Sequence, residues 1–129
     1  MNQMKQTIKV IETIFDFDYT LVISDSSLIV THSDGTSDSL NAHEFVLHEF
    51  KPDDIVDYGD FEEVIKNPRL VPQVVKRFLH SIEKNGIEHV MILSARQNSK
   101  PIIDCLKLFH LPPVKVVAIG STCPIGKAK

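Results

Sequence analysis

The chain has 129 residues, a formal net charge of −3 and 43% hydrophobic residues, a composition that fits one soluble domain with its own core. Its two cysteines are too few for a disulfide framework, and no apolar run approaches the roughly 20 residues that span a bilayer. The slight negative charge argues against extended nucleic-acid binding, although a bound divalent cation would still allow a phosphorylated substrate. We therefore expect a soluble, cytoplasmic protein that is not attached to a membrane.

The first half of the chain predicts a strand followed by a hairpin. Residues 7–15 are rich in β-branched side chains and predict the first strand. A turn signal at residues 33–35 separates two further extended segments, so residues 27–40 predict a β-hairpin.

A short helix is expected next, because Asn41 is a favourable cap for a helix that extends to about Phe50. Residues 51–60 are polar and acidic, and we predict irregular structure there, followed by a short helical turn at 61–65. In the second half of the chain, predicted helices and strands alternate more clearly.

Apolar residues at helical spacing predict a helix over residues 72–85. An apolar strand at 89–93 follows, then a helix over 100–110 with Ser99 as its cap, and a third strand at 114–119. Strands that alternate with helices indicate an α/β fold with a parallel sheet.

An Asp-x-Asp-x-Thr motif directly follows the first predicted strand, at Asp16, Asp18 and Thr20. A ligand outside the carboxyl end of a parallel strand can be reached by one carboxylate as nucleophile and by the other as proton donor. The alternative to a catalytic role is that the motif is simply a solvated acidic turn. A second signal is Ser94, which ends the strand at 89–93 and precedes Ala95 and Arg96.

Ser94 and the backbone N–H groups that follow it could hold a phosphate, because the start of a helix carries unpaired donors and a positive dipole end. Ser94 could equally be an ordinary helix cap. Together, the acidic motif and the apolar strand that ends in Ser-x-Arg resemble the first and second motifs of the haloacid dehalogenase-like (HAD) phosphohydrolase superfamily.

This resemblance implies a Rossmann-like three-layer sandwich with a parallel sheet. Residues 1–129 would form one such domain, with a flap and a small cap inserted at about 22–68. The family's fourth motif, an acidic pair after a further strand, has no counterpart before Lys129. We therefore expect the domain to be incomplete at its C-terminus, and we expect little activity from the 129-residue chain alone.

The resemblance also implies Mg²⁺-dependent hydrolysis of a phosphomonoester through an aspartyl-phosphate. Asp16 would be the nucleophile and Asp18 the general acid and base, and both would hold Mg²⁺, Asp18 through its backbone carbonyl. The substrate would be a phosphorylated small molecule or a nucleotide. The phosphoryl group would be bound by Thr20, Ser94, Ala95 and Arg96, and the family's third-motif cation would be Lys127 or, failing that, Lys129.

Two other functions remain open at this point. The stretch from Asn67-Pro68 to Arg96 looks like the 3′-phosphatase domain of polynucleotide kinases, which act on nucleic-acid ends. Alternatively, the chain is a catalytically inactive binding module that keeps the fold.

No other residues form a recognisable site. His43 and His48 lack the i, i+4 spacing of paired ligands on a helix, and the aspartates between 53 and 60 suggest a solvated acidic loop. Cys105 lies on the apolar side of a predicted helix and is expected to be an inert, buried thiol.

Overall fold

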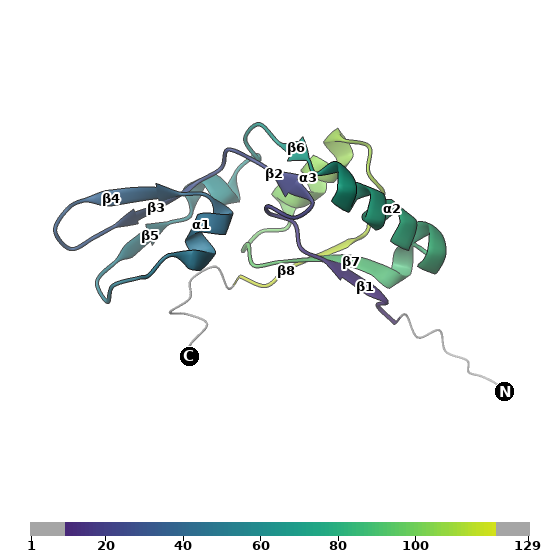
Figure 1. Cartoon of the computed structure of the whole chain (residues 1–129), viewed down its shortest axis with the longest axis horizontal. Coiled ribbons are helices and arrows are strands. Elements are labelled where there is room, and N and C mark those ends of the chain that lie inside the picture. The colour runs from purple at the N-terminus through teal and green to yellow at the C-terminus, as the bar shows by residue number, and fades with distance from the viewer. Residues whose placement is uncertain (1–9, 121–129) are drawn as a thin grey trace.

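Three parallel strands form the sheet that carries the acidic motif and the Ser-x-Arg motif. The computed structural model describes residues 10–120, and within them the sheet has the order β1 (Thr13–Phe15), β7 (Val90–Ser94) and β8 (Lys115–Ala118). Each connection runs through a helix, as Figure 1 shows. The predicted parallel α/β sheet is thus confirmed, although residues 10–12 lie outside β1, so the first strand is shorter than expected there.

Two amphipathic helices pack on this sheet. Helix α2 (Pro72–Asn85) and helix α3 (Lys100–Leu108) confirm the two predicted helices. Both contribute to one core, which also takes the alternate, inward-facing residues of β7. The buried members of this core are Phe17, Leu21, Val22, Ile65, Val74, Phe78, Val90, Ile92, Ile102, Cys105, Leu106 and Val114.

The start of α3 differs from the prediction in one detail. Ser99 makes no side-chain capping bond; instead, the side-chain oxygen of Asn98 accepts the backbone N–H of Lys100 at 3.0 Å. Within residues 10–120, the long helices α2 and α3 share the single core described above. A full three-layer sandwich is therefore not visible in this part of the chain.

A second lobe is built on an antiparallel sheet with the order β4 (Ser37–Leu40), β3 (Leu28–Thr31) and β5 (Ile55–Asp57). It confirms the predicted hairpin. The expectation of irregular structure over residues 51–60 is wrong, because β5 pairs with β3 in this stretch.

The same lobe contains helix α1 (Ala42–Leu47) and the 3₁₀ helix η1 (Gly59–Glu62). Asn41 caps α1 as predicted, in a reciprocal pair with Glu44. A small core of its own, formed by Leu28, Phe45 and Phe61, holds the lobe together. We call residues 28–62 the small lobe.

The chain enters and leaves the small lobe through one pair of short strands. Strand β2 (Val22–Ile23) runs antiparallel to β6 (Arg69–Leu70), so the two ends of the intervening segment lie side by side. The small lobe is therefore an excursion from the main sheet, as Figure 1 shows. None of the helices within residues 10–120 has the length and apolar character needed to cross a bilayer.

Candidate active site

The acidic motif forms a tight turn at the carboxyl end of β1. Phe17 and Leu21 are fully buried and anchor the turn in the core. The carbonyl of Phe17 accepts the backbone N–H groups of Leu21 and Val22 at 3.0 and 3.1 Å, and Tyr19 takes a left-handed conformation with φ of 59°. Because side chains alternate along extended chain, anchoring Phe17 inward leaves its two acidic neighbours on the opposite side.

The end of β7 lies next to this turn, because β1 and β7 are parallel neighbours. Ser94 is 3% exposed, and its hydroxyl oxygen accepts the backbone N–H of Arg96 at 3.1 Å. This is a local turn in which the hydroxyl can still donate its own hydrogen elsewhere. The two motifs, although far apart in the sequence, therefore meet at one edge of the sheet.

A cavity of about 360 Å³ opens between this edge and the small lobe. Such a volume lies in the range of small-molecule sites. The sheet side contributes every predicted site residue within 10–120, namely Asp16, Asp18, Thr20, Ser94, Ala95 and Arg96. The remaining lining residues are Tyr19, from the turn, and Leu28, Ala42, His43, Phe45, Val46 and Phe61, from the small lobe.

Asp18 and Arg96 form a nearly buried ion pair inside this cavity. Nε and Nη2 of Arg96 donate to the two carboxylate oxygens of Asp18 at 2.8 and 2.7 Å, and Nη1 donates to the carbonyl of Phe61 at 2.9 Å. The guanidinium also lies 4.2 Å from the ring centre of Phe61. Arg96 was expected to bind substrate, but in this structure its donors are directed to Asp18 and to the small lobe, so it acts first as a positioning residue.

Asp16, in contrast, is more open to solvent than Asp18, although it is still partly shielded. One of its carboxylate oxygens accepts the hydroxyl of Thr20 at 3.1 Å, so Thr20 orients the predicted nucleophile. Partial burial raises the pKa of Asp16, while hydrogen bonds from the Phe17 backbone and from Thr20 lower it and the nearby charge of Asp18 raises it further.

Sequence reasoning missed the aromatic part of the cavity. The ring of Tyr19 stacks against His43 of α1, with ring centres 6.4 Å apart, and the Tyr19 hydroxyl donates to the carbonyl of Ser24 at 3.2 Å. These residues belong to no motif. Only the folding of the small lobe over the sheet brings His43 to the acidic turn, so no local signal could have found it.

The donor atoms around Asp16 suit Mg²⁺. This ion prefers oxygen ligands, usually keeps several waters, and is typically bound by one or two carboxylates together with substrate phosphates. Asp16 can supply the carboxylate, and the carbonyl of Asp18 is the predicted second donor. Both side-chain oxygens of Asp18 are held by Arg96, which agrees with coordination of Mg²⁺ through the backbone carbonyl of Asp18 and not through its carboxylate. Lys127 lies outside the described residues.

Comparisons of the chain with protein-family models, with curated proteins and with solved structures found no match. The family resemblance therefore rests on the two motifs themselves.

Proposed function

We propose that this chain is a phosphomonoester hydrolase of the HAD type that uses Mg²⁺ and forms an aspartyl-phosphate on Asp16. The observation that supports this proposal is the convergence of the acidic motif and the Ser-x-Arg motif on one cavity at the carboxyl ends of β1 and β7. In parallel sheets this edge is where ligands bind. A solvated acidic turn would not require Ser94 and Arg96 beside it.

In the proposed first step, a carboxylate oxygen of Asp16 attacks phosphorus and the bond to the leaving oxygen breaks. Asp18 gives a proton to that oxygen. In the second step, Asp18 takes a proton from water, which attacks the aspartyl-phosphate and releases inorganic phosphate with a free Asp16. Bound Mg²⁺ would supply positive charge that offsets the repulsion between carboxylate and phosphate.

The remaining residues position these groups. Thr20 donates to one oxygen of Asp16 and so orients the carboxylate for attack. Arg96 donates to both oxygens of the Asp18 carboxylate and so fixes its orientation. The hydroxyl of Ser94 would donate to a non-bridging phosphate oxygen.

The substrate that fits this cavity is a phosphorylated small molecule rather than a phosphoprotein. The small lobe places apolar and aromatic side chains opposite the acidic turn, where they would exclude water and contact the organic part of the ester. The stacked rings of Tyr19 and His43 offer a flat surface that would suit a nucleotide. This keeps the 3′-phosphatase as an alternative within the same enzyme class.

The decisive test is the Asp16→Asn variant, assayed for Mg²⁺-dependent release of phosphate from an aryl phosphate. The amide has nearly the same shape but is a far poorer nucleophile, so turnover should fall by several orders of magnitude, more than the ~10²–10⁴-fold typical of general acid–base loss. Asp53→Asn, a change in an exposed loop residue, is the matched control and should keep full activity. Normal turnover in Asp16→Asn would refute the proposed nucleophile.

A panel of substrates then distinguishes the general phosphomonoesterase from the 3′-phosphatase. We expect hydrolysis of small phosphomonoesters and of a nucleoside 3′-monophosphate. If an oligonucleotide with a 3′-phosphate is strongly preferred over both, the 3′-phosphatase function replaces the general one.

A second candidate is a binding module without turnover, which the tight engagement of Asp18 by Arg96 favours. Such a module would bind phosphate or vanadate with the same dependence on Ser94 but would release no phosphate from any ester. Calorimetric titration of vanadate, alongside the turnover assay, distinguishes the two.

A further inference from the structure

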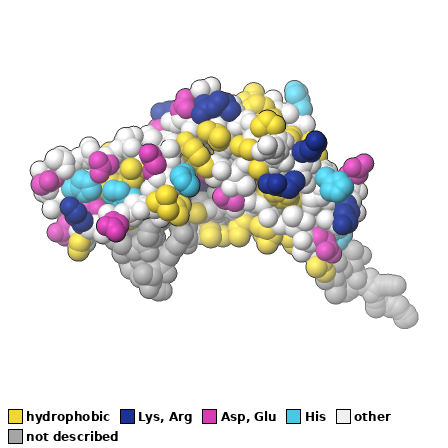
Figure 2. All heavy atoms as spheres, in the orientation of Figure 1, with side chains coloured by type: hydrophobic (Ala, Val, Ile, Leu, Met, Phe, Trp, Pro, Cys, Tyr) yellow, Lys and Arg dark blue, Asp and Glu magenta, His cyan; other side chains and the backbone are white. Residues whose placement is uncertain are grey.

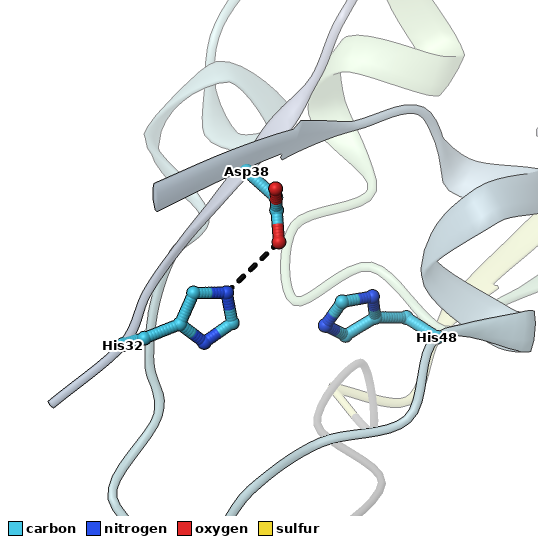
Figure 3. A group of neighbouring side chains, drawn as sticks. All are labelled: His32, Asp38 and His48. Atoms are coloured by element: carbon cyan, nitrogen blue, oxygen red, sulfur yellow. Dashed lines mark hydrogen bonds and ion pairs between the residues drawn. The ribbon is translucent and has the colours of Figure 1, made fainter. Parts of the chain in front are cut away.

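A second cluster of polar side chains lies in the small lobe and contributes nothing to the lining of the cavity described above. Its members are His32, which directly follows β3, Asp38 in β4, and His48 at the end of α1. One ligand atom from each lies within 4.8 Å of the others. Figure 2 shows histidine side chains among acidic ones over this lobe, and Figure 3 shows the three residues facing one another.

His32 is held by carboxylates on both sides of its ring. Nδ1 lies 2.7 Å from a carboxylate oxygen of Asp54, and Nε2 lies 2.8 Å from a carboxylate oxygen of Asp38. Asp54 is the firmer partner, because its side chain is 1% exposed and its second oxygen accepts the backbone N–H of Lys51. Asp54 therefore fixes the hydrogen on Nδ1 and directs Nε2 towards Asp38.

A neutral imidazole has only one N–H, so its second nitrogen would present a lone pair to a carboxylate oxygen that is itself only an acceptor. A positive charge at Nε2 removes this conflict. This charge can be that of a proton or of a metal cation. A carboxylate that holds the far nitrogen of a histidine is the usual support of a metal-bound imidazole.

The surroundings of His48 favour a metal cation over a proton as the positive charge at Nε2 of His32. Its ring stacks on His32, with ring centres 6.2 Å apart and an angle of 27° between the planes. Its Nε2 atom is buried and has no hydrogen-bond partner among the described residues, although a buried polar nitrogen normally has one. In Figure 3 the outer edge of the His48 ring points towards His32 and Asp38. A second basic nitrogen aimed at the pair suits a cation that both rings can bind.

We propose that His32, Asp38 and His48 form a binding site for a divalent transition-metal cation of the Zn²⁺ class, with Asp54 orienting His32 from behind. Two imidazoles and one carboxylate are ligands that Zn²⁺ and Co²⁺ accept, whereas Mg²⁺ and Ca²⁺ prefer oxygen alone. Ligand atoms around tetrahedral Zn²⁺ are roughly 3.3 Å apart, given bonds of about 2.0–2.1 Å. Nε2 of His32 and the Asp38 oxygen, at 2.8 Å, are closer than this, and all three ligand atoms lie within 4.8 Å of one another, so the exposed Asp38 would move back slightly to admit the ion.

Such a cation would tie together three elements of the small lobe. The ligands come from the end of β3, from β4 and from the end of α1, and the supporting carboxylate comes from the loop before β5. The site would then act as a structural clamp on the lobe that closes the cavity. It does not depend on the proposed hydrolase function.

The experiment is a titration of the metal-stripped 129-residue protein with Co²⁺, followed by its visible absorption, and with Zn²⁺, followed by thermal unfolding. It is done in a background carrying Asp16→Asn, which weakens the candidate Mg²⁺ site, and Cys123→Ser, which removes a thiol that could compete for the metal. We expect a saturable Co²⁺ band and a rise in the melting temperature with Zn²⁺, and no such effects with Mg²⁺ at the same concentration.

His48→Gln and Asp38→Asn should each lower the affinity at least tenfold, and Asp54→Asn should lower it about 10–100-fold through loss of orientation. His80→Gln, a change at an exposed histidine of α2, is the matched control and should bind as the background protein does. If His48→Gln fails to fold without metal, Asp38→Asn decides, because Asp38 is half exposed in β4. The absence of a saturable band, or a band that both variants leave unchanged, would overturn the proposal and leave His32 as part of an ion-pair network.

Discussion

At the scale of single residues, the hydrogen bond from Thr20 to Asp16 is one of the influences on the charge of the proposed nucleophile. Partial burial raises the pKa of Asp16, and the Thr20 hydroxyl, 3.1 Å away, opposes this by stabilising the carboxylate. Only the ionised form can attack phosphorus. The pH at which Asp16 becomes ionised should therefore set the acidic side of the pH–rate profile.

We expect Thr20→Val to move the acidic limb of kcat/KM to higher pH, because the variant loses a bond that lowers the pKa of Asp16. Thr20→Ser keeps the hydroxyl and should leave the limb in place. The carboxyl carbon shift of Asp16, followed by NMR during an acid titration, reports the same change without turnover. If Thr20→Val leaves both the acidic limb of kcat/KM and the midpoint of the NMR titration unchanged, the hydroxyl has no influence on the pKa of Asp16.

The sequence predicted the site residues on the sheet side and missed the contacts between them. Asp16, Asp18 and Ser94 belong to short patterns at strand ends, and parallel strands bring such ends together. The pairing of Asp18 with Arg96 joins residues 78 positions apart, and no local sequence pattern predicts it. The cluster at His32 and His48 escaped for the same reason, since its spacing follows the fold of the small lobe and not a helix period.

At the scale of elements, Arg96 joins three parts of the structure. It leaves the end of β7, pairs with Asp18 in the turn after β1, and donates to the carbonyl of Phe61 in η1 of the small lobe. The side chain of Arg96 is 1% exposed and that of Asp18 is 14% exposed. Removing one partner of such a pair leaves a buried charge without compensation.

We expect Arg96→Met to lower the free energy of unfolding by about 3–5 kcal/mol, measured by urea denaturation. The double variant Asp18→Asn, Arg96→Met should lose less than the sum of the two single variants, because it buries no lone charge. The exposed pair of Lys100 and Asp104 on α3 is the control and should show a coupling of only about 0.3–0.5 kcal/mol. Strict additivity at Asp18 and Arg96 would show that the two side chains are not coupled energetically.

The helices were easier to predict than the short strands. Helices α2 and α3 bury one face against the sheet, so their apolar residues recur at helical spacing and reveal them. Strand β5 has only Ile55 and Val56 as apolar residues within an acidic stretch, and it is extended because it pairs with β3. Pairing between distant segments overrides local preference in such strands. The supposed solvated loop also contains Asp54, whose side chain is almost fully buried.

At the scale of the whole molecule, residues 10–120 form one core beside the parallel sheet and a smaller one in the small lobe. The cavity lies where the two parts meet, so its walls come from both. The larger core contains the free thiol of Cys105, between α3 and the loop that follows the small lobe. The titration of the Cys105 thiol therefore reports on how tightly this core is packed.

Burial raises the pKa of Cys105 to about 11, from an ordinary value of 9.0, and the smaller influences of Arg96 and Asp18 act in opposite directions. The folded protein therefore keeps the thiol proton over a pH range in which the unfolded chain releases it. Because the unfolded state then binds fewer protons, the free energy of unfolding must fall as the pH rises from about 9 to about 11. One pKa unit corresponds to about 1.4 kcal/mol, so this group should account for about 2–3 kcal/mol of the loss.

The measurement is the free energy of unfolding in urea at several alkaline pH values, for the native sequence and for Cys105→Ala. Lysines and tyrosines titrate in both proteins, so the difference between the two curves isolates Cys105. We expect the native sequence to lose stability more steeply with pH than the variant does, whatever the offset between them at neutral pH. Parallel curves would mean that the thiol is reached by solvent in the folded state, and hence that the core between α3 and the sheet is looser than its packing indicates.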